Sequence, residues 1–329
     1  MKNNTIITVE DLKTFFYTNN RCNKAVNGVS FQVRKGRTLC VVGESGCGKS
    51  VTASSIMRLL PTLSRIEDDS AITYHSEKGD VRIDKLKKNG KEMRALRGSD
   101  IAMIFQDPMT ALNPVYTVGF QIMENLLHHT DLSRKNAKKR AIELLTHMGI
   151  PLPEQRFNEY PHQYSGGMRQ RAMIAMAMSC NPKVLIADEP TTALDVTIQA
   201  QIFELMEKLK DEYDTAVMMI THDMGVVAEM ADDVVVMYMG NIVEGGSIEQ
   251  VLRSPAHPYT KALLESIPIL GKGKQQEIEP IRGNTPDPFN RPKGCQFAPR
   301  CDFKTDTCDA MPDEDCPIHP LGMIRRKVT

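Results

Sequence analysis

Short apolar runs rich in β-branched residues alternate with longer helical patterns along the chain. The runs at 38–43 (TLCVVG), 183–188 (KVLIAD) and 216–223 (AVMMITHD) have the length and composition of buried strands. The stretch at 50–60 is typical of a helix, and 197–213 places apolar residues at helical spacing. Strands that alternate with helices in this order predict an α/β fold with a mainly parallel sheet.

Two stretches depart from this alternation. Residues 107–180 are rich in helical patterns, with 133–150 the clearest, and we predict that they form a helical insertion into the α/β body. The basic cluster from Arg134 to Arg140 fits a solvated helix face within this insertion. Residues 233–246 alternate around a Gly-Asn pair, which is typical of a β-hairpin.

The composition changes after about residue 266, where Pro, Gly, Lys and Asp become frequent. Such a change is typical of a linker that leads into a small appendage. We therefore predict one large domain over 1–265 and a C-terminal appendage over 266–329, which suits a chain of 329 residues.

Charge and hydropathy narrow the functional classes. Lys plus Arg and Asp plus Glu both number 41, so the formal net charge is zero and gives no electrostatic reason to expect nucleic acid as a partner. No apolar run approaches the roughly 20 residues that span a bilayer, and the first residues lack the layout of a signal peptide. These features predict a cytoplasmic chain with reduced thiols.

The segment GESGCGKS at 43–50 fits the phosphate-binding pattern G-x-x-x-x-G-K-[ST], and a predicted strand precedes it while a predicted helix follows. Glycines let backbone N–H groups curl around phosphate oxygens, and the helix N-terminus adds its positive end. Lys49 would meet the β and γ phosphates, and the Ser50 hydroxyl would bind Mg²⁺. The predicted nucleotide-binding residues here are Gly43, Glu44, Ser45, Gly46, Cys47, Gly48, Lys49, Ser50 and Val51.

Cys47 occupies a position of this loop where any small residue fits. A second hypothesis is that modification of its thiol impairs the ATPase, in which case alkylation would disturb nucleotide binding.

The run VLIADEP at 184–190 ends a buried strand in two carboxylates. Strand ends that face a phosphate loop are where an Mg²⁺-binding carboxylate belongs, so Asp188 takes that role. Glu189 is placed to polarise the attacking water as a general base.

Further motifs resemble one family. YSGGMRQR at 164–171 resembles the signature motif of ATP-binding-cassette (ABC) ATPases. MIFQDP is similar to the family's Q-loop and contains Gln106, while TTALD is similar to the D-loop and ends at Asp195. ITHD is similar to the H-loop and contains His222. The motifs follow the family's order along the chain.

The resemblance covers residues 1 to about 260 and implies the family's fold. That fold is a RecA-like P-loop NTPase core with a helical subdomain and an antiparallel β portion. Phe16, which lies between Phe15 and Tyr17, is at the place where the family has an aromatic ring stacked on adenine.

The resemblance also implies a mechanism in which two such subunits associate head to tail. ATP and Mg²⁺ lie between the phosphate loop of one subunit and the signature motif of the other. Ser165, Gly166 and Gly167 would meet the γ-phosphate of the partner's nucleotide. His222 would contact the γ-phosphate, and Gln106 would serve as an Mg²⁺ ligand and as part of the catalytic set.

The segment SPAHPYTKALLESIP at 254–268 is similar to the C-terminal motif of the ATPases of dipeptide, oligopeptide and nickel importers. The implied function is ATP-driven import of peptides, with nickel or an oligosaccharide as the alternative substrate. The implied partners are a second ATPase subunit (a second copy or a related chain), two membrane permease subunits and an extracytoplasmic substrate-binding protein. Dimer closure would reach the permeases through the region at 106–113, at the cytoplasmic face of the membrane.

Other functions are disfavoured. ABC proteins of DNA repair or translation usually carry two cassettes or a long coiled-coil insertion, and this sequence shows neither. A purely regulatory nucleotide-binding module would not need Glu189 and His222.

Four cysteines gather near the end of the chain with the spacing C-x5-C-x6-C-x7-C. Zinc sites usually contain a C-x2-4-C pair, which is absent, whereas spacings in Fe–S sites vary more. The other possible states of these four cysteines are disulfides and thiols without a ligand. The segment CQFAPRC is similar in sequence to the corresponding segment of the peptide-importer ATPases, and some of these bind a 4Fe–4S cluster there. The resemblance therefore favours a 4Fe–4S cluster, with Zn²⁺ as the alternative. The predicted ligands are Cys295, Cys301, Cys308 and Cys316.

Overall fold

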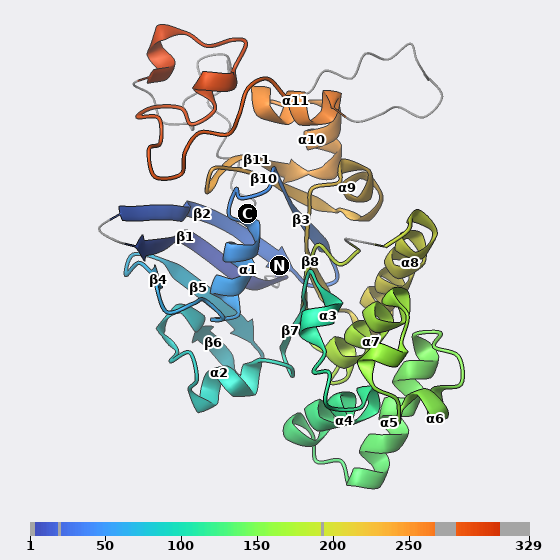
Figure 1. The fold of residues 1–329 in the computed structure, drawn as a ribbon. Coiled ribbons are helices and arrows are strands. Elements are labelled where there is room, and N and C mark those ends of the chain that lie inside the picture. Colours follow the sequence, from blue (N-terminus) through green and yellow to red (C-terminus); the bar gives the residue numbers. More distant parts are fainter. Residues whose placement is uncertain (1–3, 19–20, 192–193, 267–280, 310–329) are drawn as a thin grey trace. The chain divides into compact units, whose positions relative to one another are not determined.

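The structure is a computed structural model, and it describes four stretches of the chain: 4–18, 21–191, 194–266 and 281–309. Figure 1 shows the chain as a ribbon. Its described residues group into two compact units. The first unit draws its residues from 1–34, 38–85 and 221–329, and the second draws them from 35–37 and 86–220.

An antiparallel sheet forms one part of the first unit. Its strands follow the order β2-β1-β5-β6, with β4 also paired to β1. They are β1 (Thr5–Thr18), β2 (Arg21–Arg34), β4 (Ser64–Ile66), β5 (Ala71–Ser76) and β6 (Gly79–Arg82). Ile7, Val9 and Leu12 of β1 are buried and anchor the sheet in the core. The antiparallel portion implied by the resemblance is thus present.

The first unit also contains β3 (Thr38–Val42), β10 (Asp233–Tyr238) and β11 (Asn241–Ser247). β3 and β10 pair in parallel, and β10 and β11 form the predicted hairpin. The turn itself lies one residue before the Gly-Asn pair. Tyr238 pairs with Asn241, so the turn residues are Met239 and Gly240, with φ of 44° and 80°. Two positive φ values in a two-residue turn match the right-handed twist of the strands.

Among its described residues, the first unit also contains four helices and three 3₁₀ turns. They are α1 (Lys49–Ile56), α9 (Met224–Met230), α10 (Ile248–Arg253), α11 (Pro258–Glu265), η1 (Ile83–Lys85), η4 (Ala298–Arg300) and η5 (Asp306–Asp309). α1 is shorter than the predicted 50–60, because Arg58 has a left-handed φ of 51° that ends the helix. His257 caps α11, since its Nδ1 accepts the Tyr259 N–H at 3.1 Å.

The second unit is built on three parallel strands, in the order β7-β8-β9. They are β7 (Ile101–Ile104), β8 (Val184–Asp188) and β9 (Ala216–Thr221). Every residue of β8 and β9 is buried, as their continuous apolar sequence predicts. Helix α8 (Val196–Tyr213) connects these two strands and confirms the predicted strand-helix-strand order.

The remaining helices of this unit gather in the stretch predicted as a helical insertion, drawn in green in Figure 1. They are α3 (Pro108–Ala111), α4 (Val118–His129), α5 (Arg134–His147), α6 (Pro153–Arg156), η2 (Pro161–Gln163) and α7 (Gly166–Met178), preceded by α2 (Lys91–Leu96). α4, α5 and α7 contact one another and bury Ile122, Leu144 and Ile174. No strand is present among the described residues of 107–180.

None of the helices in the described stretches combines the length and the apolar character needed to cross a bilayer. The division of the chain near residue 265 stays a prediction. The described residues are grouped differently, because those of 221–266 and 281–309 belong to the same unit as the N-terminal strands.

Candidate active site

The predicted phosphate loop connects β3 to α1. Gly43 and Gly48 have φ of 148° and 105°, in the region that residues with a side chain rarely adopt. A Cβ at Gly43 would lie 2.1 Å from the Met237 carbonyl oxygen, and one at Gly48 would lie 2.3 Å from that of Ala25. The loop can therefore form only with glycine at both positions.

Lys49 and Cys47 point into this loop. The Lys49 ammonium is buried and donates hydrogen bonds to the carbonyls of Gly43 at 2.7 Å and Glu44 at 3.0 Å. It also lies 3.8 Å from Cys47 Sγ. Burial raises the pKa of the Cys47 thiol, although the Lys49 charge acts in the opposite direction. The thiol is therefore mostly protonated at neutral pH and is a poor nucleophile.

Glu44 has partners from the C-terminal part of the chain. Its carboxylate accepts hydrogen bonds from Arg300 Nη1 at 2.5 Å and Nη2 at 2.9 Å, and its backbone N–H donates to the Tyr259 hydroxyl at 2.8 Å. The hydrogen bond to Glu44 raises the pKa of Arg300, so the guanidinium stays charged. Neither partner could be predicted from the sequence, because 256 and 215 residues separate them from Glu44 and no local pattern signals so distant a contact.

Phe16 lies in β1 and is partly exposed. Its two aromatic neighbours have other contacts. The Phe15 ring lies 5.6 Å from the Lys24 ammonium, and the Tyr17 hydroxyl donates to Glu67 at 2.9 Å. The assignment of Phe16 as the ring that stacks on adenine stays a prediction.

Asp188 and Glu189 lie at the end of β8. Asp188 is buried, and Glu189 follows with a left-handed φ of 45° while its N–H donates to the Ile220 carbonyl at 2.9 Å. Strained backbone of this kind persists where the surrounding structure holds it, and functional sites are enriched in it.

Gln106 reaches Glu189 from the neighbouring strand. Its Nε2 donates to Glu189 Oε2 at 2.8 Å. The register explains the contact, because Ile104 of β7 pairs with Ala187 of β8 and both side chains come two residues later. Two of the predicted catalytic residues are thus brought together.

The signature motif begins α7. Ser165 caps the helix, with its hydroxyl accepting the Met168 N–H at 3.3 Å. Gly166 and Gly167 are the first helical residues, and Gly167 packs against Ile198 at the start of α8. Asp195 caps α8 by accepting the Ile198 N–H at 3.0 Å. The Gln170 amide donates to the Pro190 carbonyl, so the signature helix is bonded to the loop that follows Glu189.

His222 is exposed and lies between β9 and α9. The next residue, Asp223, caps α9 by accepting the Gly225 N–H at 2.7 Å. The loop after β9 therefore belongs to the first unit, as do the phosphate loop and Phe16. The second unit contains Gln106, Asp188, Glu189 and the signature motif.

Three of the four tail cysteines are described, and Cys316 lies outside the described residues. Cys295 and Cys308 are buried, their segments are joined by a hydrogen bond from the Cys295 N–H to the Cys308 carbonyl at 2.9 Å, and none of the three is in a disulfide. Within the described part of the chain, no three His, Cys, Asp or Glu residues form a group that could hold a metal ion. The described residues therefore give no support to the predicted iron–sulfur cluster or to the zinc alternative.

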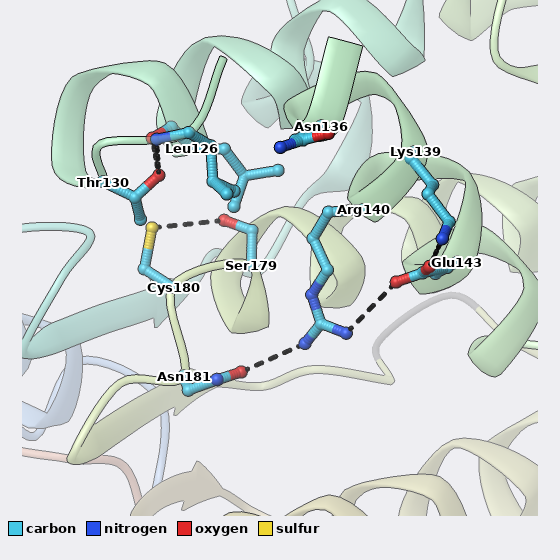
Figure 2. Close-up of a pocket in the computed structure, with 10 residues that line it drawn as sticks. Leu126, Thr130, Asn136, Lys139, Arg140, Glu143, Ser179, Cys180 and Asn181 are labelled. Atoms are coloured by element: carbon cyan, nitrogen blue, oxygen red, sulfur yellow. Dashed lines mark hydrogen bonds and ion pairs between the residues drawn. The ribbon is translucent and has the colours of Figure 1, made fainter. Parts of the chain in front are cut away.

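A pocket of about 510 Å³ lies among the helices of the second unit (Figure 2). Arg140 donates to Asn181 at 3.4 Å and lies 3.7 Å from Glu143, which also pairs with Lys139 at 3.9 Å. The positive charges at its rim are therefore partly compensated within the chain. No residue predicted for the nucleotide site lines it.

Comparisons with known proteins agree with these motifs. The family model of the ABC transporter matches residues 26–192, and the model of the oligopeptide/dipeptide transporter C-terminal region matches 243–308. The chain is 51% identical over 304 residues to the dipeptide transport ATP-binding protein DppD of Bacillus subtilis, which covers 92% of this chain and 89% of DppD. It is 48% identical over 304 residues to the oligopeptide transport ATP-binding protein AppD of the same organism, with 92% and 90% covered.

Among solved structures, the dimeric structure of MJ0796, a bacterial ABC transporter cassette, is similar to this chain with a TM-score of 0.64 and 25% identity. The match covers 74% of this chain and 99% of that one. The α/β cassette fold with its helical insertion and antiparallel portion agrees with this likeness. The chain therefore belongs to the ABC transporter family, as an ATP-hydrolysing member that carries the C-terminal region of oligopeptide and dipeptide transporters.

Proposed function

We propose that this chain hydrolyses ATP to energise the import of di- or oligopeptides across the cytoplasmic membrane. The observation that carries the ATPase assignment is the hydrogen bond between Gln106 and Glu189, beside Asp188 at adjacent strand ends. It places a carboxylate and an amide side by side where a water could be oriented. The peptide assignment is supported by the relatives at about half identity, whose names specify dipeptide and oligopeptide transport.

The phosphate loop would hold the nucleotide through backbone N–H groups between Gly43 and Val51 and through the start of α1. Lys49 is already inside the loop, and exchanging its carbonyl partners for phosphate oxygens would need only a local movement. Phe16 would stack on adenine through its partly exposed ring.

Mg²⁺ fits the types of ligand that are present. Asp188 offers a buried carboxylate, Ser50 a hydroxyl, and Gln106 its amide oxygen, because the amide nitrogen is the atom that bonds Glu189. Oxygen ligands of this kind are those that Mg²⁺ prefers. When bound, the ion would neutralise charge on the phosphates.

Glu189 would accept a proton from the attacking water, and Gln106 would hold the carboxylate in place. His222, at the loop after β9, would contact the γ-phosphate. The N–H groups of Gly166 and Gly167, at the start of α7, would meet the γ-phosphate of a partner's nucleotide, with Ser165 and Asp195 beside them.

The partners in this proposal follow from the head-to-tail arrangement. A second ATPase subunit would supply the facing signature motif, and two permease subunits would receive the movement through the Q-loop region. An extracytoplasmic binding protein would select the peptide. The chain would act at the cytoplasmic face of the membrane.

We also propose that the four tail cysteines hold one metal centre, a 4Fe–4S cluster or Zn²⁺, which would staple a small appendage. The support for this comes from the gathering of the four cysteines in the sequence and from the match of residues 243–308 to the C-terminal region of oligopeptide and dipeptide transporters. Iron and zinc analysis of anaerobically purified protein tests the idea, and the absence of both metals would contradict it.

The test of the ATPase assignment is Glu189→Gln. The amide keeps the shape and the strained backbone but cannot accept the proton, so hydrolysis should fall by about 100-fold or more. ATP binding, measured by equilibrium titration, should remain. Glu207→Gln on the exposed face of α8 is the matched control and should hydrolyse ATP normally. Near-normal turnover of Glu189→Gln would refute the assignment.

A further inference from the structure

The C-terminal region contributes a charged side chain to the phosphate loop. Arg300 ends the 3₁₀ turn η4 and lies directly before Cys301. Its side chain is 4% exposed, which is rare for an arginine unless it has partners. The principal partner is Glu44, the second residue of the loop.

The pairing has the geometry of a fixed fork. Both terminal nitrogens of Arg300 contact the two carboxylate oxygens of Glu44, at 2.5 and 2.9 Å. The remaining Nε donates to the Arg282 carbonyl at 3.0 Å, which orients the guanidinium from behind. Bidentate arginine–carboxylate pairs are stronger and more specific in direction than single contacts.

Tyr259 holds the backbone of the same residue. Its hydroxyl accepts the Glu44 N–H at 2.8 Å, and its ring is completely buried. The ring packs against Tyr238 at 4.7 Å and Phe297 at 5.4 Å between centroids. Glu44 is therefore fixed at its N–H by α11 and at its carboxylate by η4.

A carboxylate in a loop that binds a polyphosphate is electrostatically unfavourable, because the two negative charges repel each other. The Glu44 side chain is 28% exposed, so solvent only partly screens its charge. Arg300 places a compensating charge in direct contact with it. Without that charge, the loop would present a carboxylate to an anionic ligand.

We propose that Arg300 is a positioning residue of the nucleotide site, which neutralises and orients Glu44 so that the loop accepts the phosphates of ATP. The C-terminal region thereby acts on nucleotide affinity and is more than a family-specific appendage. The inference rests on the proposed function, because it requires ATP at this loop.

The experiment uses the full chain and compares Arg300→Met with the double variant Arg300→Met/Glu44→Gln. ATP affinity is measured by titration with a fluorescent ATP analogue, and KM and kcat are measured in parallel. Arg300→Met should weaken ATP binding about ten-fold, because it leaves a carboxylate uncompensated in the loop, and should raise KM more than it lowers kcat. Glu44→Gln in the double variant removes the uncompensated charge and should restore affinity to within about three-fold of the parent.

Arg282→Met is the matched control. Arg282 forms an exposed ion pair with Asp302 at 3.4 Å in the same region, and it accepts the Arg300 hydrogen bond through its backbone carbonyl, which the substitution keeps. Its replacement should leave ATP affinity unchanged.

Two outcomes would overturn the inference. One is an unchanged affinity in Arg300→Met. The other is a loss that Glu44→Gln does not repair, which would mean that Arg300 only supports the folding of this region. Failure of the parent chain to bind ATP would instead refute the proposed function, so the two failures are distinguishable.

Discussion

Two helices of this chain begin at glycine-rich turns that are built in different ways. In the loop before α1, Gly43, Gly46 and Gly48 all have left-handed φ values. At the start of α7, Gly166 and Gly167 are ordinary helical residues behind a serine cap. A Cβ at Gly166 would meet its nearest neighbour, Leu194, at 3.9 Å, which is an ordinary contact.

This difference in backbone conformation indicates that glycine has two different roles in the two turns. The phosphate loop needs glycine for its own shape, because other residues would strain or block its backbone. The exposed turn at Gly166 has no such internal need, so the missing side chain there leaves room for something from outside the chain. A nucleotide held by a partner subunit fits that use.

The largest effect is expected for Gly48→Ala, in the phosphate loop. Its Cβ would lie 2.3 Å from the Ala25 carbonyl oxygen and the residue would keep a φ of 105°. The strain and the clash together should weaken ATP binding by about 100-fold or more, measured by equilibrium titration.

Gly46→Ala is the matched control. Gly46 also has a positive φ, 81°, but a Cβ there has no neighbour within 4 Å. Its loss of affinity should be about ten-fold or less, because only backbone strain contributes. Equal losses in the two variants would show that the close approach of Ala25 does not shape the loop.

Gly166→Ala should have an intermediate effect that appears only in the assembled transporter. Alanine favours the helix by up to about 1 kcal/mol over glycine, so the thermal stability of the chain should stay or rise. ATP binding by the single chain should also stay. In the proposed head-to-tail pair, hydrolysis should fall about ten-fold, because the new methyl group would occupy space that the partner's nucleotide would need.

Arg134→Ala is the control for this variant, since Arg134 holds the same first position behind the serine cap of α5. Its hydrolysis should match that of the parent. If Gly166→Ala hydrolysed ATP normally in the assembled transporter, the open turn would have no role in the reaction.

Local patterns predicted a large part of this fold. β3, β8, β9, α5 and α8 lie where apolar runs and helical spacing placed them. The N-terminal strands were implied only by the resemblance, because register shifts in β1, such as the one between Val9 and Leu12, interrupt the alternation of buried positions. The early end of α1 was also hidden, since Arg58 adopts a left-handed conformation without the glycine that usually signals it.

In the candidate site, too, some features could be predicted from the sequence and others could not. Each motif is a short segment whose chemistry is visible in its own letters, so the loop, Asp188 and Glu189 could be named from sequence. The Arg300–Glu44 pair joins segments 256 residues apart, and its charges look like any other surface charges until the fold brings them together. A motif thus predicts what a residue can do, whereas its partners follow from tertiary packing.

The last prediction concerns Cys47, because the reactivity of its thiol shows how closed the phosphate loop is. Its thiol is buried and its pKa is raised, so the reactive thiolate is scarce at neutral pH. Alkylation, followed by mass spectrometry of peptides, should be about ten-fold slower at Cys47 than at the exposed Cys22 and should speed up as the pH rises towards the raised pKa. Once modified, Cys47 should impair ATP binding, because the added group lies beside the Lys49 ammonium, 3.8 Å from the sulfur. Equal alkylation rates at the two thiols at pH 7 would show that the phosphate loop opens readily. The phosphate loop would then differ less from the exposed turn at the start of α7 than the structure indicates.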